Sequence, residues 1–197
     1  MKIATCEIMG ISPYSQSKHY SKEMVPKLQG ENDRDYESRT WRNRLHVNDD
    51  GKIFIPPMAF KNCISDCAKF LSLPIPGKGK STYTKNLQAG ILVVEPIPLP
   101  IKRDDCESEV LFVPSDGRPG GGSRVEKCFP VIRTWGGHLQ ILVFDETVLN
   151  AYDSAKTTVL EHVLKQAGLF IGIGRFRPRN NGFYGRFEIK KFAVSQS

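Results

Sequence analysis

Several features that would assign a chain to a special class of protein are missing from this sequence. No apolar run approaches the roughly 18 residues that a membrane-spanning helix needs. Glu7 interrupts the apolar stretch near the N-terminus, so a signal peptide is not indicated. No segment recurs at the intervals of about 20–50 residues that mark repeat proteins. The 197 residues, 40% hydrophobic and 25% charged, predict a soluble, cytoplasmic protein that folds as a single domain.

Cysteine spacing typical of a metal site is also missing. The chain has 5 cysteines, but none forms a Cys-x-x-Cys pair, and Cys63 and Cys67 are spaced to share one face of a predicted helix. A zinc site would need two further ligands at suitable spacing, and the sequence offers none nearby. We therefore expect reduced, buried thiols, and we predict neither a metal nor a cofactor.

Nucleotide-binding motifs are incomplete. Residues 76–82, PGKGKST, are superficially similar to a P-loop, but Pro74 stands where that motif needs its first glycine. The pair Gly172 and Gly174 lacks the third glycine of a dinucleotide-binding fingerprint. The sequence therefore excludes NTP hydrolysis, and the loop 77–85 is better interpreted as a mobile basic segment that contacts phosphate.

Positive charge is in excess and unevenly distributed. The chain has 28 Lys and Arg against 21 Asp and Glu, a net charge of +7. The excess is concentrated in residues 56–90 and 168–197, and the remainder is slightly acidic. Two basic segments on an otherwise neutral chain predict a polyanionic partner such as nucleic acid.

Hydrophobic periodicity predicts an α+β protein. The helices have apolar residues at helical spacing, and the strands are short apolar or alternating runs. One helix is expected to open at Pro56-Pro57 and to stop before Pro74, and another at 155–167. Strands are expected at 2–10, 44–55 (a hairpin through Asp50-Gly51), 91–94, 128–133, 138–145, 169–174 and 183–194.

This order predicts a ferredoxin-like or RRM-like palm, a modified βαββαβ unit with an antiparallel sheet. The palm would comprise residues 1–11, 44–100 and 128–197. Two large loop insertions would interrupt it, at about 12–43 and 101–127, because both segments are polar and lack regular periodicity.

The segment 172–187, GIGRFRPRNNGFYGRF, carries the clearest chemical signal. Its glycines would let the backbone approach a ligand and cradle phosphate with its amides. Its three alternating arginines would repel one another without an anion and suit phosphate. Phe183 and Tyr184 could stack on bases, and Asn180 and Asn181 could turn the chain in left-handed conformations.

Two patterns together resemble the RAMP superfamily of CRISPR-associated RNA-binding proteins. In residues 51–71, GKIFIPPMAFKNCISDCAKFL, Ile55 and Pro56 match the family's turn and Lys61 matches its lysine, while Asn62 replaces the usual glycine. The second pattern is a strand at 138–144, a helix at 155–167 and a glycine-rich loop at 172–185, as at the C-terminus of that superfamily.

The resemblance implies a backbone-type subunit of a CRISPR ribonucleoprotein complex. Such a subunit would bind guide RNA without sequence preference, oligomerise along it, and contact other effector subunits and target nucleic acid. The insertion 101–127 would be a thumb that projects between stretches of RNA. The residues predicted to contact RNA, from the resemblance and from charge, are Lys61, Asn62, Lys78, Lys80, Lys85, Arg118, Arg124, Lys127, Gly172, Gly174, Arg175, Arg177, Arg179, Asn180, Asn181, Phe183 and Tyr184.

We predict no catalytic residue, but alternatives remain open at the level of sequence. A RAMP-type endoribonuclease that matures CRISPR RNA would need a general base, for which His19 and His46 are candidates. Metal-assisted cleavage would need an aspartate in the first insertion, where Asp33 and Asp35 lie. A virus-borne homologue that interferes with a CRISPR complex is a further possibility.

Overall fold

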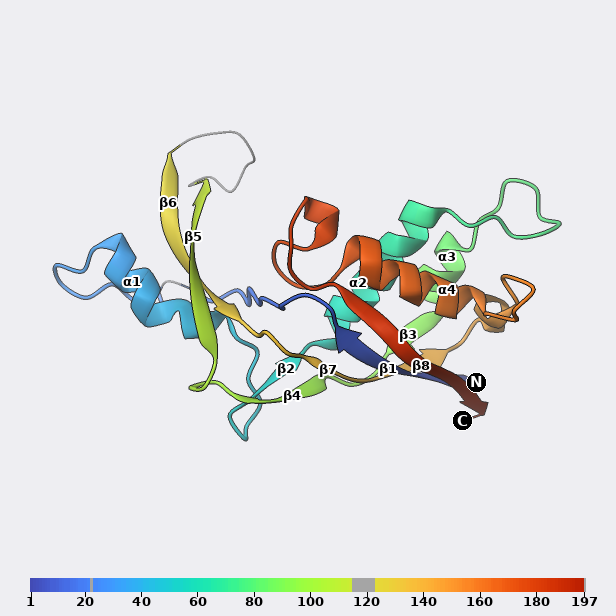
Figure 1. The fold of residues 1–197 in the computed structure, drawn as a ribbon, viewed down its shortest axis with the longest axis horizontal. Helices are drawn as coiled ribbons and strands as arrows, with labels where there is room; N and C mark the ends of the chain where they lie inside the picture. The colour runs from blue at the N-terminus through green and yellow to red at the C-terminus, as the bar shows by residue number, and fades with distance from the viewer. Residues whose placement is uncertain (22, 115–122, 197) are drawn as a thin grey trace.

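The core of the molecule is an antiparallel sheet covered on one face by two helices (Figure 1). A computed structural model describes residues 1–21, 23–114 and 123–196. The sheet order is β3-β7-β1-β8. Alternate side chains of β1 are buried, as at Ala4, Cys6 and Ile8, because they face the helices. The sheet strands are β1 (Lys2–Gly10), β3 (Ile91–Val93), β7 (Gly136–Val143) and β8 (Phe187–Gln196).

The chain order through this core is β1, α2 (Pro57–Leu71), β3, β7, α4 (Val159–Gln166) and β8. It is a βαββαβ unit with both β7 and β8 antiparallel to β1. This is the ferredoxin-like arrangement, so the predicted fold class is confirmed.

The helix α2 forms where the sequence predicts it. Pro57 occupies its first turn, where the missing N–H costs nothing, and Ser72 ends it in a left-handed conformation. Phe60, Ile64 and Cys67 are buried against the sheet. The chain then forms α3 (Thr84–Ala89), which includes the end of the segment predicted as a basic loop.

The second palm helix differs from the prediction at both ends. It begins at Val159, because the Thr158 side chain accepts a hydrogen bond from the Glu161 amide, and residues 153–157 form a turn. It continues into a π-helical turn, η3 (Ala167–Ile171), so the predicted strand at 169–174 is wrong. An apolar run of this length does not distinguish a buried strand from a buried helical turn.

A second, small sheet pairs β2 (Lys52–Ile55) with β4 (Ile97–Lys102). The strand β4 was not predicted, because its prolines are strand breakers in most contexts. Pro98 and Pro100 lie on its exposed side, whereas Ile97 and Leu99 are buried. A strand with only one paired edge tolerates proline in this way.

Both predicted loop insertions contain regular structure. The first holds α1 (Asp33–Thr40), followed by a 3-10 turn, η1 (Trp41–Arg44). The second holds β5 (Glu107–Pro114) and β6 (Arg124–Val131), which pair as an antiparallel ribbon that projects beside α1 (Figure 1). We call this ribbon the thumb. Further 3-10 turns lie at η2 (Glu146–Leu149) and η4 (Pro178–Asn180). Among the described residues, no helix has the length and apolar character to cross a membrane.

Candidate nucleic-acid interface

Two adjoining cavities form a groove between the insertions and the palm. The α1 cavity, of about 490 Å³, lies between segment 17–21, α1 and the base of the thumb. The α2 cavity, of about 530 Å³, lies between the start of α2 and residues 172–186, here called the glycine loop. Ser17 and Arg175 line both cavities, so the two are continuous. The groove brings together Asn62, Lys127, Gly174, Arg175, Arg177 and Asn180 of the predicted residues.

Arg175 lies at the junction of the two cavities. Its guanidinium carbon is 3.6 Å from the centre of the Phe129 ring and 4.5 Å from that of Phe176, so two aromatic rings hold it. One terminal nitrogen donates a hydrogen bond to the Ser17 hydroxyl at 3.3 Å. Its Nε is buried and has no hydrogen-bond partner among the described residues.

The electrostatic setting of Arg175 suits an incoming anion. Burial, with the nearby Arg44 cation as a smaller cause, lowers the pKa of Arg175 to about 10. The side chain remains protonated at neutral pH. No described carboxylate forms an ion pair with it. An anion in the groove would therefore neutralise its charge.

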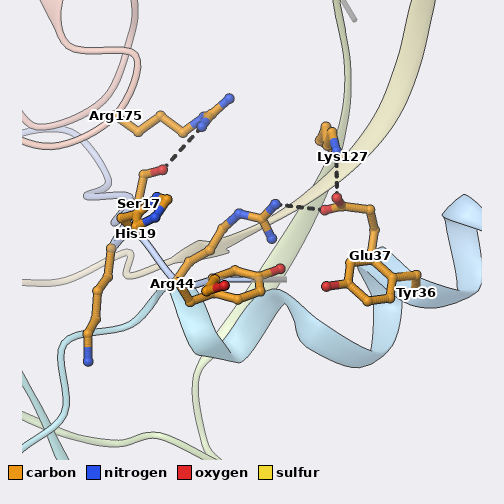
Figure 2. Close-up of a pocket in the computed structure, with 10 residues that line it drawn as sticks. Ser17, His19, Tyr36, Glu37, Arg44, Lys127 and Arg175 are labelled. Atoms are coloured by element: carbon orange, nitrogen blue, oxygen red, sulfur yellow. Dashed lines mark hydrogen bonds and ion pairs between the residues drawn. The ribbon is translucent and has the colours of Figure 1, made fainter. Parts of the chain in front are cut away.

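A buried carboxylate organises the other cations of the α1 cavity (Figure 2). Glu37 of α1 contacts Arg44 at 2.9 Å and Lys127 of the thumb at 2.6 Å. One terminal nitrogen of Arg44 is also buried and unpartnered among the described residues. Four cations, Lys18, Arg44, Lys127 and Arg175, thus line the cavity with one acid, which leaves the cavity positively charged.

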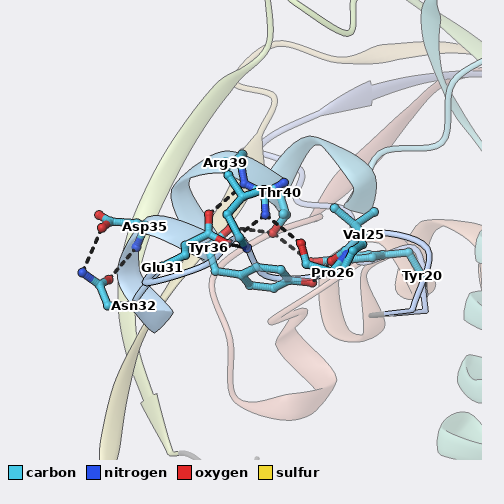
Figure 3. A network of polar contacts seen from close by, with 10 residues as sticks. Tyr20, Val25, Pro26, Glu31, Asn32, Asp35, Tyr36, Arg39 and Thr40 are labelled. Carbon is cyan, nitrogen blue, oxygen red and sulfur yellow. Dashed lines mark hydrogen bonds and ion pairs between the residues drawn. The ribbon is translucent and has the colours of Figure 1, made fainter.

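Polar contacts fix α1, which carries Glu37, against the preceding loop (Figure 3). Asn32 caps the helix by accepting a hydrogen bond from the Asp35 amide. Arg39 binds Glu31 through two nitrogens, and the Tyr36 hydroxyl donates to the carbonyl of Val25. These contacts hold the wall of the α1 cavity in place.

The glycines of the loop serve close packing of the chain against itself. Gly174 has a φ of +77°, and a Cβ there would collide with the Ser15 carbonyl and the Tyr14 ring. Gly172 has a φ of +67° and lies against Pro178. The amide of Gly185 donates to the Pro13 carbonyl at 2.7 Å, and that of Arg175 donates to Ser15 at 2.9 Å. These two amides are occupied within the protein, so neither is available for the predicted phosphate cradle.

The anion expected for the other two loop arginines is part of the protein. Arg177 and Arg179 contact the two carboxylate oxygens of Asp66, on α2, at 3.2 and 2.9 Å. The prediction that these arginines need an external anion is therefore wrong. Because two guanidinium groups share one carboxylate, the cluster keeps a positive charge.

The two aromatic residues at the end of the loop have different surroundings, one exposed and one buried. Phe183 is exposed. Tyr184 is buried, and its hydroxyl donates to Glu109 of the thumb at 2.5 Å. Burial, followed by this hydrogen bond, raises the pKa of Tyr184 to about 12. Tyr184 thus fastens the loop to the thumb instead of offering a face to a base. Asn180 and Asn181 are exposed, and Asn181 is left-handed as predicted.

The remaining predicted contacts are dispersed. The Lys61 ammonium donates to the carbonyls of Leu87 and Gln88 at the end of α3, which makes it a structural group and not a free cation. Lys78, Lys80 and Lys85 are exposed, and the loop carrying the first two lies at the opposite end of the molecule from the thumb (Figure 1). Arg124 is exposed at the start of β6, and Arg118 lies outside the described residues.

The candidate catalytic groups have ordinary surroundings. His19 is exposed at the α1 cavity, and His46 packs beside Phe54 at 5.6 Å. Asp33 pairs with Lys27 at 2.7 Å, and Asp35 accepts a hydrogen bond from the capping Asn32. The described residues include no cluster of three or more His, Cys, Asp or Glu suited to a metal ion.

Sequence reasoning missed Glu37, Arg44 and Phe129. Glu37 and Arg44 lie seven residues apart, two helical turns, and this spacing was the available signal. No signal in the sequence indicated Phe129, because its role depends on the ribbon that places its ring against Arg175.

No family model matches the sequence, and no curated protein does. Solved structures, in contrast, are similar to this chain. A chain in the cryo-EM structure of the type III-B Cmr-beta bound to cognate target RNA is 9% identical, with a TM-score of 0.53, over 99% of this chain and 61% of that one. This chain therefore shares its fold with that Cmr-beta chain. The resemblance found in the sequence is thus confirmed at the level of fold.

This chain spans 61% of the length of the Cmr-beta chain that it matches. The crystal structure of Cmr6 from Pyrococcus furiosus is also similar, at 13% identity and a TM-score of 0.45, over 96% of this chain and 99% of that one.

Proposed function

We propose that this RAMP-like chain is a non-catalytic RNA-binding subunit of a CRISPR ribonucleoprotein complex, and that it holds guide RNA in the groove. The observation that carries the proposal is Arg175, a desolvated cation held between Phe129 and Phe176 with a buried, unused donor. Arg44 and Lys127 add positive charge beside it. The fold likeness to a chain from an RNA-bound Cmr complex supports the same assignment.

Binding would be largely independent of RNA sequence. The cationic groups of the groove are arginine and lysine, whose natural partners are phosphate oxygens, and phosphates carry no sequence information. The thumb, with exposed Val110 and Phe112, would project between stretches of RNA. Further copies of this chain and other effector subunits are the proposed protein partners.

The test is single-stranded RNA binding measured over a range of salt concentrations. We expect Arg175→Ala to lower affinity about tenfold for all sequences alike, and to reduce the slope of log affinity against log salt by about 0.7. The matched control is Lys191→Ala, which removes an 84% exposed cation from the sheet. Circular dichroism would check that both variants fold. Wild-type affinity in Arg175→Ala would refute the assignment of the groove.

Cleavage of RNA is the competing function, because His19 lies at the same cavity as four cations, Lys18, Arg44, Lys127 and Arg175. Incubation of end-labelled CRISPR-repeat RNA with the wild type and with His19→Ala separates the two. We expect intact RNA in both reactions. Cleavage by the wild type that is lost in His19→Ala would establish an endoribonuclease in place of a binding subunit.

A further inference from the structure

Beyond the groove, aromatic side chains are exposed on the helical side of the palm. Phe70, in the last turn of α2, is 62% exposed, and Phe170, in η3, is 51% exposed. Their ring centres lie 6.0 Å apart with the planes tilted by 35°. Leu169 and Phe183 are exposed nearby. We call these four residues the aromatic patch.

Cations border this patch. The Arg186 guanidinium donates to the carbonyls of Leu169 and Phe183, at 3.3 and 3.5 Å, and so joins the two sides of the patch. Lys69 is exposed next to Phe70. Asp66, one turn before Phe70 on α2, is already shared by two arginines. The border therefore carries a positive charge that the protein does not neutralise.

The patch is continuous with the groove. Arg177 lines the α2 cavity and also binds Asp66. Asp66 and Phe70 lie on the same face of α2, because they are four residues apart. A strand that leaves the α2 cavity along this arginine cluster would next meet Phe70 and Phe170.

We infer that the aromatic patch is a second RNA contact, on which bases stack as the strand leaves the groove; this inference rests on the proposed function. Exposed rings bordered by cations are the surface on which proteins bind single-stranded nucleic acid, because every base has a face to stack and every nucleotide a phosphate. A second copy presenting the same face would bring cations against cations. An acidic, apolar protein segment is the competing occupant.

The first experiment compares RNA lengths. The double variant Phe70→Ala, Phe170→Ala should bind an oligonucleotide of about 6 nucleotides as the wild type does, and should bind one of about 20 nucleotides on the order of tenfold more weakly. Its salt dependence should be unchanged, because no cation is lost.

Three further variants serve as comparisons. Arg175→Ala should weaken the binding of both oligonucleotides. Phe70→Tyr with Phe170→Tyr should retain wild-type affinity, and Met24→Ala, at an 81% exposed apolar position elsewhere, is the control.

The second experiment detects stacking directly. Trp41 and Trp135 are both buried, so Phe170→Trp would add an exposed indole with distinct emission. We expect the longer RNA to quench this emission and the shorter RNA to leave it unchanged. The inference would be overturned if the longer RNA bound tightly without quenching the indole and if the double alanine variant bound it with wild-type affinity. That outcome would leave the assignment of the groove intact. If, in addition, the double alanine variant no longer retained a protein that copurifies with the wild type, the patch would be assigned to a protein partner. Absence of RNA binding at any length would overturn both proposals.

Discussion

Arginines of one loop have different roles because their neighbours differ. Arg177 and Arg179 have a carboxylate within ion-pair distance and fasten the loop to α2. Arg175 has aromatic rings and unused donor capacity instead. An alternating basic pattern in sequence therefore combines two arginines that fasten the loop with one that we propose binds RNA, and only the surroundings of each side chain separate the two.

Glu37 should affect stability and RNA binding in opposite directions. Its side chain is 7% exposed and bonded to both Arg44 and Lys127. In Glu37→Gln the two cations lose the negative charge that both of them contact. This loss should lower the free energy of unfolding by about 3 kcal/mol in urea titrations. The same change removes a negative charge from the cavity and should raise RNA affinity roughly fivefold.

The control for this prediction is Glu146→Gln, which removes an exposed partner of Lys2. It should change stability by less than about 0.5 kcal/mol. Weaker RNA binding in a folded Glu37→Gln variant would contradict the placement of phosphate beside Glu37.

At the scale of elements, the glycine loop owes its shape to packing against segment 13–15. Gly174, with a φ of +77°, has the Ser15 carbonyl and the Tyr14 ring where a Cβ would lie. Gly51, with a φ of +74°, has open space at the same position. The two glycines thus share their backbone conformation and differ in their surroundings.

Alanine at these two positions separates backbone strain from collision. Gly51→Ala should lower the free energy of unfolding by about 1 kcal/mol, the cost of a left-handed alanine. Gly174→Ala should lower it by roughly 3 kcal/mol, because a collision adds to that cost. Chemical denaturation measures both. Equal losses would show that the loop yields to the added methyl group.

Some helices and strands could be predicted from the sequence and others could not. The strand at 2–10 and the helix at 57–71 were predictable because each has a local period. The thumb was interpreted as a loop because the glycine-rich residues 117–122 dominate its composition, although 107–113 has strand-forming residues. The ends of α4 depended on a cap at Thr158 and on burial of Ala167, Gly168 and Ile171 in the turn that follows, which periodicity does not encode.

At the scale of the whole molecule, contacts between distant segments define the site, and no local pattern predicts them. Glu37 meets Lys127 across 90 positions of the chain, and Arg177 meets Asp66 across 111. Lys127 and Arg175, which the sequence predicts as RNA contacts, both line the groove, but the sequence could not supply Glu37. It also could not show that Lys61 binds the end of α3.

Stability should fall in mild acid. Burial, with a smaller effect from Lys18, lowers the pKa of His46 below its ordinary value, and burial does the same for His162. The unfolded chain therefore binds more protons below about pH 6.5, and folding becomes less favourable as the pH falls through that range. Urea unfolding at about pH 7.5 and about pH 5.5 measures this loss.

In His46→Gln the loss between the two pH values should be smaller than in the wild type, with the remainder due to His162 and to acidic groups. A wild type that is more stable at the lower pH would contradict the sign. An unchanged loss in His46→Gln would contradict the contribution of this ring.

The buried cysteines have a practical consequence. All five are enclosed, and burial raises the pKa of Cys6 and Cys67 to about 12 and that of Cys106 to about 11. Thiolate, the form that attacks maleimide reagents, is therefore scarce at these three sites at neutral pH. A single new cysteine on the surface, such as Lys85→Cys, would accept a spin label in the otherwise native chain. Distances between such labels would then test the proposed assembly of copies along RNA, because only neighbouring copies bring two labels close together.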